Sequence, residues 1–287
     1  MDKFSGSEDD FEVYPPKRDS VTNFKTTLDN LRVALSAADL KSHSREGEAV
    51  NDTLIRLALN SSANASVLFR KNDSAEETKI NAWLSIVDER AKSYLMRGDV
   101  GRFSGLSEES LRGIAEISLQ PERIATLPDI LAKYHGVILV VEPGFKSMKM
   151  DGCVYNLPQG TPVVGVSVRY NRYDNFWFTL MHELAHISLH YERLNNPILD
   201  DLELGSEADV EVEANIVAKD SLVSRQHWRL IWGVRDKVDL MVDACRKADV
   251  HPAIAAGMIR YQSKNYALYP DLIKVMDVRR AFGFSDD

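Results

Sequence analysis

Two histidines and a glutamate near the middle of the chain have the types and the spacing of a metal-dependent hydrolase. His182, Glu183 and His186 form the pattern H-E-x-x-H within residues 176–190. On an α-helix, residues four apart share one face and lie about 6 Å apart along the axis, so both histidines can bind one metal ion. Glu183 lies beside them, where it can polarise a water molecule on the metal. Since most neighbouring residues are apolar, we expect a zinc site on a buried helix.

A third protein ligand is expected, because catalytic zinc usually takes three and leaves one position for water. The downstream acidic residues are candidates, although each one alone could simply belong to a solvated helix face; they are Glu207, Asp209, Glu211 and Glu213. Glu211 and Asn215 lie one helical turn apart. In that arrangement the carboxylate binds the metal while the amide orients a ligand histidine.

His190 follows His186 by four residues and is a tempting additional ligand. The metzincin pattern would instead need a glycine turn and a histidine six positions after the second ligand. We expect His190 to be a histidine at a helix end, where the helix dipole favours its cation. A role in supporting the ligand histidines is the alternative.

Length and composition predict an ordinary globular protein. The chain has 287 residues, 44% hydrophobic and 27% charged, which is enough for a full core in one or two domains. It contains no apolar run of membrane-spanning length, and its first residues lack the apolar region of a signal peptide. Two cysteines are too few for a disulfide framework. We therefore expect a cytoplasmic protein without membrane association, and the net charge of -8 argues weakly against a large nucleic-acid-binding surface.

Hydrophobic periodicity predicts an α+β fold in which helices precede a small sheet and the H-E-x-x-H helix follows it. Strands are expected at residues 137–141, 153–155 and 162–168. Helices are expected at residues 21–40, 50–59, 76–98, 107–119, 127–134, 176–190, 207–221, 228–249, 253–262 and 270–280.

Three regions follow from this order. Residues 1–75 form a tail and a helical region of uncertain role, residues 76–230 the catalytic domain, and residues 231–287 a helical extension. Polar segments at residues 1–20 and 71–74 are expected to be a mobile tail and a linker. The first region has no convincing turn and recognition helix, so direct nucleic-acid binding stays open beside an interaction module or a simple extension.

Two separate motifs resemble one protein family. Residues 178–186 read F-T-L-M-H-E-L-A-H, and residues 211–218 read E-V-E-A-N-I-V-A. These runs are similar to the F-T-x-x-H-E-x-x-H and E-x-E-A-N-x-x-A motifs of the ImmA/IrrE family of zinc metallopeptidases. Residues 169–178 and 251–257 also resemble the peptidase-like part of HigA-type antitoxin regulators, so the resemblance extends from Ile80 to about Gln262.

The resemblance implies a zincin-like metallopeptidase with a small sheet, an active-site H-E-x-x-H helix and helical terminal regions. It implies that His182, His186 and Glu211 bind Zn²⁺ and that Glu183 is the general base, with Glu213 as the fallback third ligand. The sequence departs from the family at residues 221–224, where the usual L-x-P segment has no proline. The amino-terminal helix-turn-helix of many HigA-type relatives is not evident either, which puts autonomous DNA binding in doubt.

Cys153 lies ahead of the active helix, in a strand that would line the substrate cleft of a relative. A thiolate there could occupy the fourth zinc position and inhibit the enzyme. The alternative is a small buried hydrophobe, which is the usual fate of a lone cysteine.

The expected function is a zinc-dependent endopeptidase in which His190, Tyr191 or Tyr170 stabilises the oxyanion. By the resemblance, its substrate would be a partner protein, such as a helix-turn-helix repressor or an antitoxin, in a stress, phage or mobile-element response. The acidic surface would suit a basic DNA-binding partner. The alternative is a non-proteolytic antitoxin-like regulator that uses the fold to bind a toxin or DNA, although such a scaffold would not need the glutamate.

Overall fold

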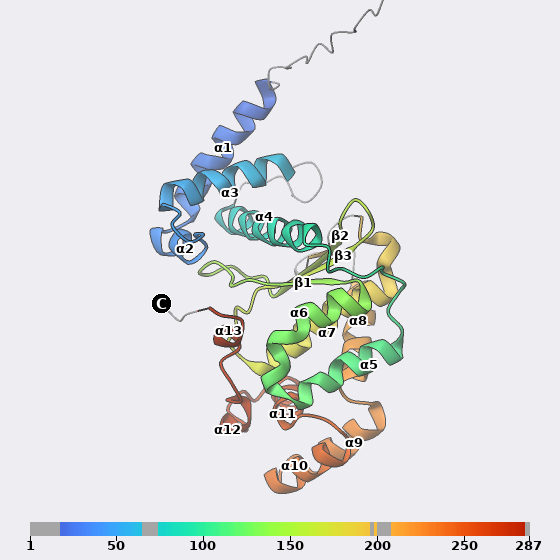
Figure 1. Cartoon of the computed structure of the whole chain (residues 1–287). Helices are drawn as coiled ribbons and strands as arrows, with labels where there is room; N and C mark the ends of the chain where they lie inside the picture. The colour runs from blue at the N-terminus through green and yellow to red at the C-terminus, as the bar shows by residue number, and fades with distance from the viewer. Residues whose placement is uncertain (1–17, 65–73, 196–197, 200–207, 285–287) are drawn as a thin grey trace, which may run out of the picture.

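The computed structural model describes residues 18–64, 74–195, 198–199 and 208–284. Within these ranges most residues are helical, and four strands form one sheet (Figure 1). Most of the expected tail at residues 1–20 and of the linker at 71–74 lies outside the described residues. No helix in the described part of the chain combines the length and the apolar character that a membrane span would require.

The described part of the chain begins with four helices: α1 (Arg18–Ala34), α2 (Ala37–Ser42), α3 (Val50–Asn64) and α4 (Ala75–Met96). Helix α3 packs on both α1 and α4, and α1 extends away from the rest of the molecule at the top of Figure 1. The prediction of one helix over residues 21–40 is wrong. The Ser36 hydroxyl accepts a hydrogen bond from the Asp39 amide in a capping box, so a new helix begins there. Ser74 and Glu77 start α4 in the same way.

The sheet consists of β1 (Ile138–Val141), β2 (Gly152–Asn156), β3 (Pro162–Val166) and the short β4 (Ile198–Leu199), in the order β1-β3-β2-β4. Strand β3 is parallel to β1 and antiparallel to β2, and β4 is antiparallel to β2. The three strands expected from β-branched runs are confirmed within two residues. Strand β4 was not predicted, because two residues are too few to show a periodicity.

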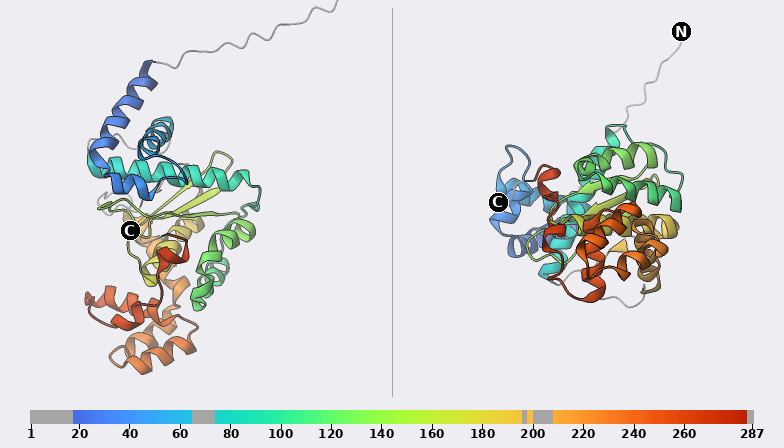
Figure 2. Two further views of the ribbon diagram at one scale, coloured as in Figure 1. Left: turned by 60° about the vertical axis from the view of Figure 1, so that its left-hand side comes forward. Right: turned by 90° about the horizontal axis from the view of Figure 1, so that it is seen from below.

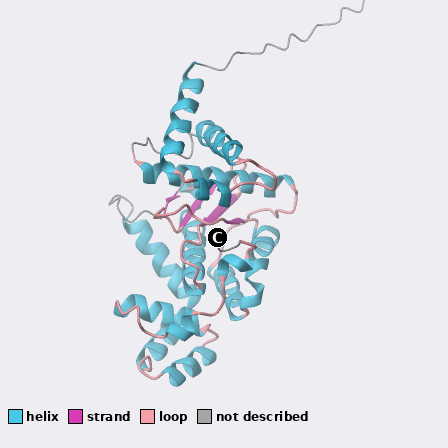
Figure 3. Cartoon of the chain, turned by 90° about the vertical axis from the view of Figure 1, so that its left-hand side faces the viewer, coloured by secondary structure: helices cyan, strands magenta, loops and turns pink. Residues whose placement is uncertain are grey.

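Helices cover both faces of the sheet, as Figure 3 shows with the strands between two helical layers. Because side chains alternate along a strand, each strand contributes to two separate cores. On β1 and β2, Ile138 and Cys153 pack with α4, whereas Leu139 and Val154 belong to the cluster that contains α7 (Tyr173–His190). The N-terminal helices thus lie on one side of the sheet and the H-E-x-x-H helix on the other.

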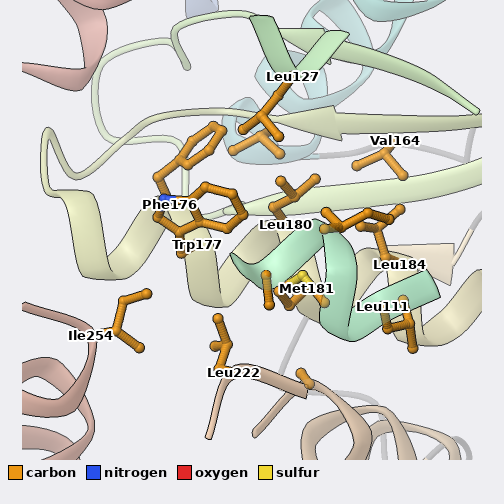
Figure 4. Close-up of a cluster of buried hydrophobic side chains, with 14 of the residues drawn as sticks. Leu111, Leu127, Val164, Phe176, Trp177, Leu180, Met181, Leu184, Leu222 and Ile254 are labelled. Carbon is orange, nitrogen blue, oxygen red and sulfur yellow. The ribbon is translucent and has the colours of Figure 1, made fainter. Parts of the chain in front are cut away.

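Helix α7 is the central helix of the larger core. Thirteen of its 18 residues are buried. Figure 4 shows Leu180, Met181 and Leu184 among the buried side chains of this core, with Val164 of the sheet above and Ile254 below. A helix that is apolar on most sides is expected to be enclosed by other elements.

The remaining elements surround α7. Before the sheet lie α5 (Glu108–Glu116), η1 (Ile117–Leu119), η2 (Pro121–Thr126), α6 (Leu127–Ile130) and the π-helical η3 (Leu131–His135). After α7 come η4 (Tyr191–Arg193), α8 (Ala208–Leu222), α9 (Arg225–Gly233), α10 (Val238–Lys247), α11 (Pro252–Ser263), α12 (Pro270–Ile273) and α13 (Val278–Ala281). Helices α9 to α11 lie below the layer of α5 to α8 in Figure 1 and in the left view of Figure 2.

Two of the predicted C-terminal helices are divided. The helix expected at residues 228–249 is divided into α9, which ends at Gly233, a residue type of low helix propensity, and α10, which begins at Val238. The helix expected at 270–280 is also interrupted. The Asp277 side chain accepts the Arg280 amide hydrogen and starts α13 as a separate turn.

The α+β class predicted from the sequence is confirmed by this arrangement of helices around a small mixed sheet. The division of the chain at residues 75 and 230 stays a prediction. Leu31 and Leu57 of the N-terminal helices share one hydrophobic cluster with Trp83 of α4.

A polar network also ties α3 to its neighbours. The Arg56 guanidinium, whose side chain is 12% exposed, contacts Glu48 at 2.9 Å and Glu89 at 3.1 Å and donates to the His43 carbonyl. The hydrogen bond from Arg56 is the main cause that lowers the pKa of Glu48, which falls to about 2 from an ordinary 4.5. For Glu89, burial acts to raise the pKa, but hydrogen bonding to Arg45 and the charge of Arg56 lower it overall.

We predict that Arg56→Met lowers the free energy of unfolding by about 2 to 4 kcal/mol at pH 7, because the largely buried Glu48 carboxylate loses its ion-pair partner and Glu89 loses Arg56 while it retains Arg45. Because the folded-state pKa of Glu48 is depressed, its contribution is complete above about 4.5 and is lost as the pH falls towards 2. Denaturant unfolding at pH 7 and pH 3 should therefore show a smaller difference between variant and wild type at pH 3. The control is Arg225→Met, which removes a surface pair with a 72% exposed arginine and should cost less than about 1 kcal/mol. An equal cost for both variants at pH 7 would contradict the prediction.

Candidate metal centre

Three side chains from two adjacent helices converge in the core. His182 and His186 lie one turn apart on α7, and Glu211 lies in the first turn of α8. The two helices pack side by side (Figure 1). Among the described residues, these three form the one group of His, Cys, Asp and Glu side chains whose ligand atoms all lie within 4.8 Å of one another.

The donor atoms form a compact triangle. The two Nε2 atoms are 3.0 Å apart, and the Glu211 carboxylate places one oxygen 3.0 Å from His182 Nε2 and the other 3.3 Å from His186 Nε2. Ligands of a tetrahedral zinc ion with bonds of about 2.1 Å are separated by about 3.4 Å. Two imidazole nitrogens and one carboxylate oxygen are also a donor set of catalytic zinc sites. The residues present therefore fit a zinc ion.

The charge of the group suits a cation as well. Burial raises the pKa of the Glu211 carboxyl, but hydrogen bonds with His182 and His186 outweigh it and lower the pKa to about 2. The carboxylate is therefore ionised at neutral pH, as a metal ligand must be. The histidine side chains are at most 4% exposed and that of Glu211 is 24% exposed, so Glu211 is the member of the group with the most contact with solvent.

Glu183 occupies a second position on α7, next to the start of β2. It is 1% exposed. A Cβ atom added to Gly152 would lie 2.2 Å from Glu183 Oε1 and 2.9 Å from its Cγ. Only a residue without a side chain allows the carboxylate to lie this close to the strand backbone.

Gly152 is the site residue that sequence reasoning missed. A glycine that begins a β-branched strand can indicate close approach of another group, and this signal was present in the sequence. Within residues 151–153, a role was predicted only for Cys153, whose reactive side chain is a possible zinc ligand, and none for the glycine.

The prediction that Cys153 is an inhibitory fourth ligand is contradicted by its position. Its side chain points to the α4 face of the sheet, where a Cβ on Gly165 would meet Cys153 Sγ together with atoms of Trp83 and Val87. Glu183 lies against the opposite face, at Gly152, because neighbouring residues of a strand alternate. Burial, followed by the negative charge of Glu183, also raises the pKa of the Cys153 thiol well above its ordinary value. Cys153 is the small buried hydrophobe of the alternative interpretation.

Glu213, the fallback third ligand, is directed to another histidine. Its side chain is 60% exposed, and its Oε2 lies 3.6 Å from His190 Nε2. The ring of His190 is 5.8 Å from that of His186, centroid to centroid. Burial, and then the charge of His186, lowers the pKa of His190. The expected helix-end cation is therefore disfavoured, although His190 does lie in the last turn of α7.

The remaining candidates make other contacts. Asn215 is half-buried on α8, but the Nδ1 atoms of His182 and His186 have no hydrogen-bond partner among the described residues, so the predicted orienting bond is not formed.

The Tyr191 hydroxyl donates to the Gly160 carbonyl at 2.7 Å, and Tyr170 is 47% exposed beside the Arg169 guanidinium. Of the other acids, Asp209 is exposed and Glu207 lies outside the described residues.

Comparison with known protein families agrees with this position of the site. Residues 132–239 match the family described as Peptidase_M78, IrrE N-terminal-like domain. The matched range contains α7, α8 and all three converging residues, but it is shorter than the predicted region of resemblance, which began at Ile80 and ended at about Gln262. Comparisons with curated proteins and with solved structures gave no significant match.

We predict that purified wild-type protein binds about one zinc ion per chain and that His182→Ala binds none, because two remaining ligands hold zinc weakly. At a free zinc concentration of about 100 times the dissociation constant, the ion should stabilise wild type by about 2.7 kcal/mol and the variant not at all. Elemental analysis and unfolding with and without a chelator test this. His227→Ala on α9 is the matched control and should bind zinc like wild type. Zinc retention by His182→Ala would contradict the assignment.

A second prediction concerns Gly152. Gly152→Ala should retain zinc, since no ligand is altered, but should displace Glu183 and destabilise the fold by about 1 to 3 kcal/mol. Gly113→Ala on α5 has no heavy atom within 4 Å of the new Cβ and should be neutral or stabilising. Zinc content and denaturant unfolding of both variants provide the measurement. Equal stability of the two variants would show that the close contact is absent.

Proposed function

We propose that residues 132–239, which form an ImmA/IrrE family peptidase domain, act as a zinc-dependent endopeptidase on a partner protein. The observation that carries the proposal is the convergence of His182, His186 and Glu211 beside a buried Glu183. A zincin-like arrangement is proposed as well, on the basis of a ligand helix packed against a mixed sheet and a third ligand on the following helix.

His182, His186 and Glu211 would hold the zinc ion. When bound, the ion would lower the pKa of a water molecule and polarise the scissile carbonyl. Glu183 accepts the proton of the attacking water and passes it to the leaving amine. Because the Glu183 carboxylate is enclosed in the core, bulk water is excluded from it and its electrostatic effect on the reacting groups is stronger.

A partner protein is proposed as the substrate, by family resemblance, with a helix-turn-helix repressor or an antitoxin as the favoured class. The net charge of -8 supports a basic partner, because complementary charge accelerates and orients encounters. A cytoplasmic location and a role in a stress or mobile-element response remain predictions. A peptidase is favoured over a non-proteolytic scaffold because a scaffold would have no need of Glu183.

The test is to co-express the protein with the product of each neighbouring gene and to follow the intact partner by mass spectrometry. Wild type should cleave one partner, whereas Glu183→Gln should bind zinc normally and cleave at least about 100-fold more slowly, because the general base is lost. Glu192→Gln makes the same chemical change at an exposed position and should retain activity. Full cleavage by Glu183→Gln would refute the mechanism. Stable binding of a partner without cleavage by wild type would favour the scaffold alternative.

A further inference from the structure

Glu183 shares helix α7 with two of the proposed zinc ligands, but its carboxylate contacts a different part of the fold. The three ligands belong to α7 and α8, whereas the Glu183 carboxylate lies against Gly152 at the start of β2. The position of the general base therefore depends on what fixes the start of this strand. The residue next to Gly152 in the chain is Asp151.

An ion pair fixes Asp151. Arg169 Nε lies 2.9 Å from Asp151 Oδ1, and Arg169 Nη2 donates to Asp151 Oδ2 at 3.2 Å. Both side chains are less than one-third exposed. The Asp151 carbonyl also accepts the Ser167 amide hydrogen at 2.9 Å. The Nη2 contact is a hydrogen bond and the Nε contact is a close contact between opposite charges, so the pair holds the two side chains at a fixed distance.

Arg169 belongs to the connection between β3 and α7, which is itself held by the C-terminal helix α13. Arg279 Nε donates to the Val168 carbonyl and Arg279 Nη2 donates to the Arg169 carbonyl, both at 3.1 Å. The Arg279 amide donates to Asn171 Oδ1 at 3.0 Å. One side chain therefore binds two successive carbonyls of the connection, and its backbone binds a third group.

The backbone of this connection needs such support. Val168 has a φ of 39°, in the left-handed region that a β-branched residue rarely adopts, and it is 3% exposed. Strained backbone of this kind persists when surrounding contacts determine it, and it occurs most often at functional sites. The Arg279 bond to the Val168 carbonyl is one of these contacts.

We propose that Arg279 is a positioning residue for Glu183, which it holds in place through Arg169, Asp151 and Gly152. Helix α13 is then part of the catalytic frame, although it contributes no zinc ligand and lies outside the family match at residues 132–239. This inference rests on the proposed function for its effect on catalysis. The contacts that carry it are independent of that function.

The proposal separates base positioning from metal binding. Arg279→Met should leave zinc stoichiometry unchanged and lower kcat about 10- to 100-fold with little change in KM. A displacement of a catalytic group by about 1 Å has effects of this size on the rate. Arg279→Lys keeps a charged donor but cannot bind both carbonyls, so it should recover part of the lost kcat. Arg280→Met changes the exposed neighbour on the same helix and should match wild type.

Hydrogen exchange of backbone amides provides a measurement that does not need activity. In zinc-loaded protein, the amides of residues 151–154 should exchange faster in Arg279→Met than in wild type or Arg280→Met. Wild-type exchange in this segment together with wild-type kcat would overturn the proposal. If wild type cleaves no partner, the proposed function fails, and the exchange comparison alone then decides the positioning role.

Asp151→Asn is the second variant in case Arg279→Met does not fold. It preserves the shape of the side chain and removes only the charge that Arg169 binds. It should show the same pattern of retained zinc, reduced kcat and faster exchange at residues 151–154. Zinc loss equal to the loss of activity would overturn the proposal, because it would show a general collapse of the site.

Discussion

The site depends on the burial of a polar face of α7 in an apolar core. An unpaired imidazole or carboxylate in such a place costs several kcal/mol, so each polar group needs a partner. The Nε2 atoms of both histidines meet this requirement by facing each other and Glu211 of α8, whereas the Nδ1 atoms have no hydrogen-bond partner among the described residues. The packing of α7 against α8 and the assembly of the donor triangle are therefore one event, and the hydrophobic residues on the other sides of α7 hold both helices in place.

Neighbouring residues of β2 face opposite sides of the sheet, so one strand serves both the candidate site and the α4 core. At the start of β2, Gly152 faces the catalytic side and Cys153 faces α4. The same strand thus makes room for a carboxylate on one face and fills a hydrophobic contact on the other. A shift of register by one residue would place the thiol beside Glu183 and the glycine against Trp83, so the α4 core also protects the chemistry of the site.

The α7 motif and the strands were predictable from local patterns. Once the helix forms, the spacing of H-E-x-x-H places both histidines on one face. Apolar runs such as residues 137–141 indicate a strand even when the strands that pair with it are unknown. Helical spacing left several acids open as the third ligand, and the resemblance to the family favoured Glu211, which lies beside both histidines. Prediction from the sequence was wrong where a single local contact decides the structure. The examples are the Ser36 cap, which divides the first helix, and the face of β2 on which Cys153 lies. The sequence could not show the Arg279 contacts either, because they join residues about 110 positions apart and leave no periodic signal.

The long separation between Arg279 and the rest of the site has a consequence for synthesis. Arg279 lies 68 positions after Glu211, so at roughly 5 to 20 residues per second it follows the last zinc ligand by about 3 to 14 seconds. If the site binds metal as proposed, a nascent chain could bind it before Glu183, the proposed general base, is held in place. On the proposed function, such an order would keep a growing polypeptide at low activity until α13 has packed against the connection that carries Arg169.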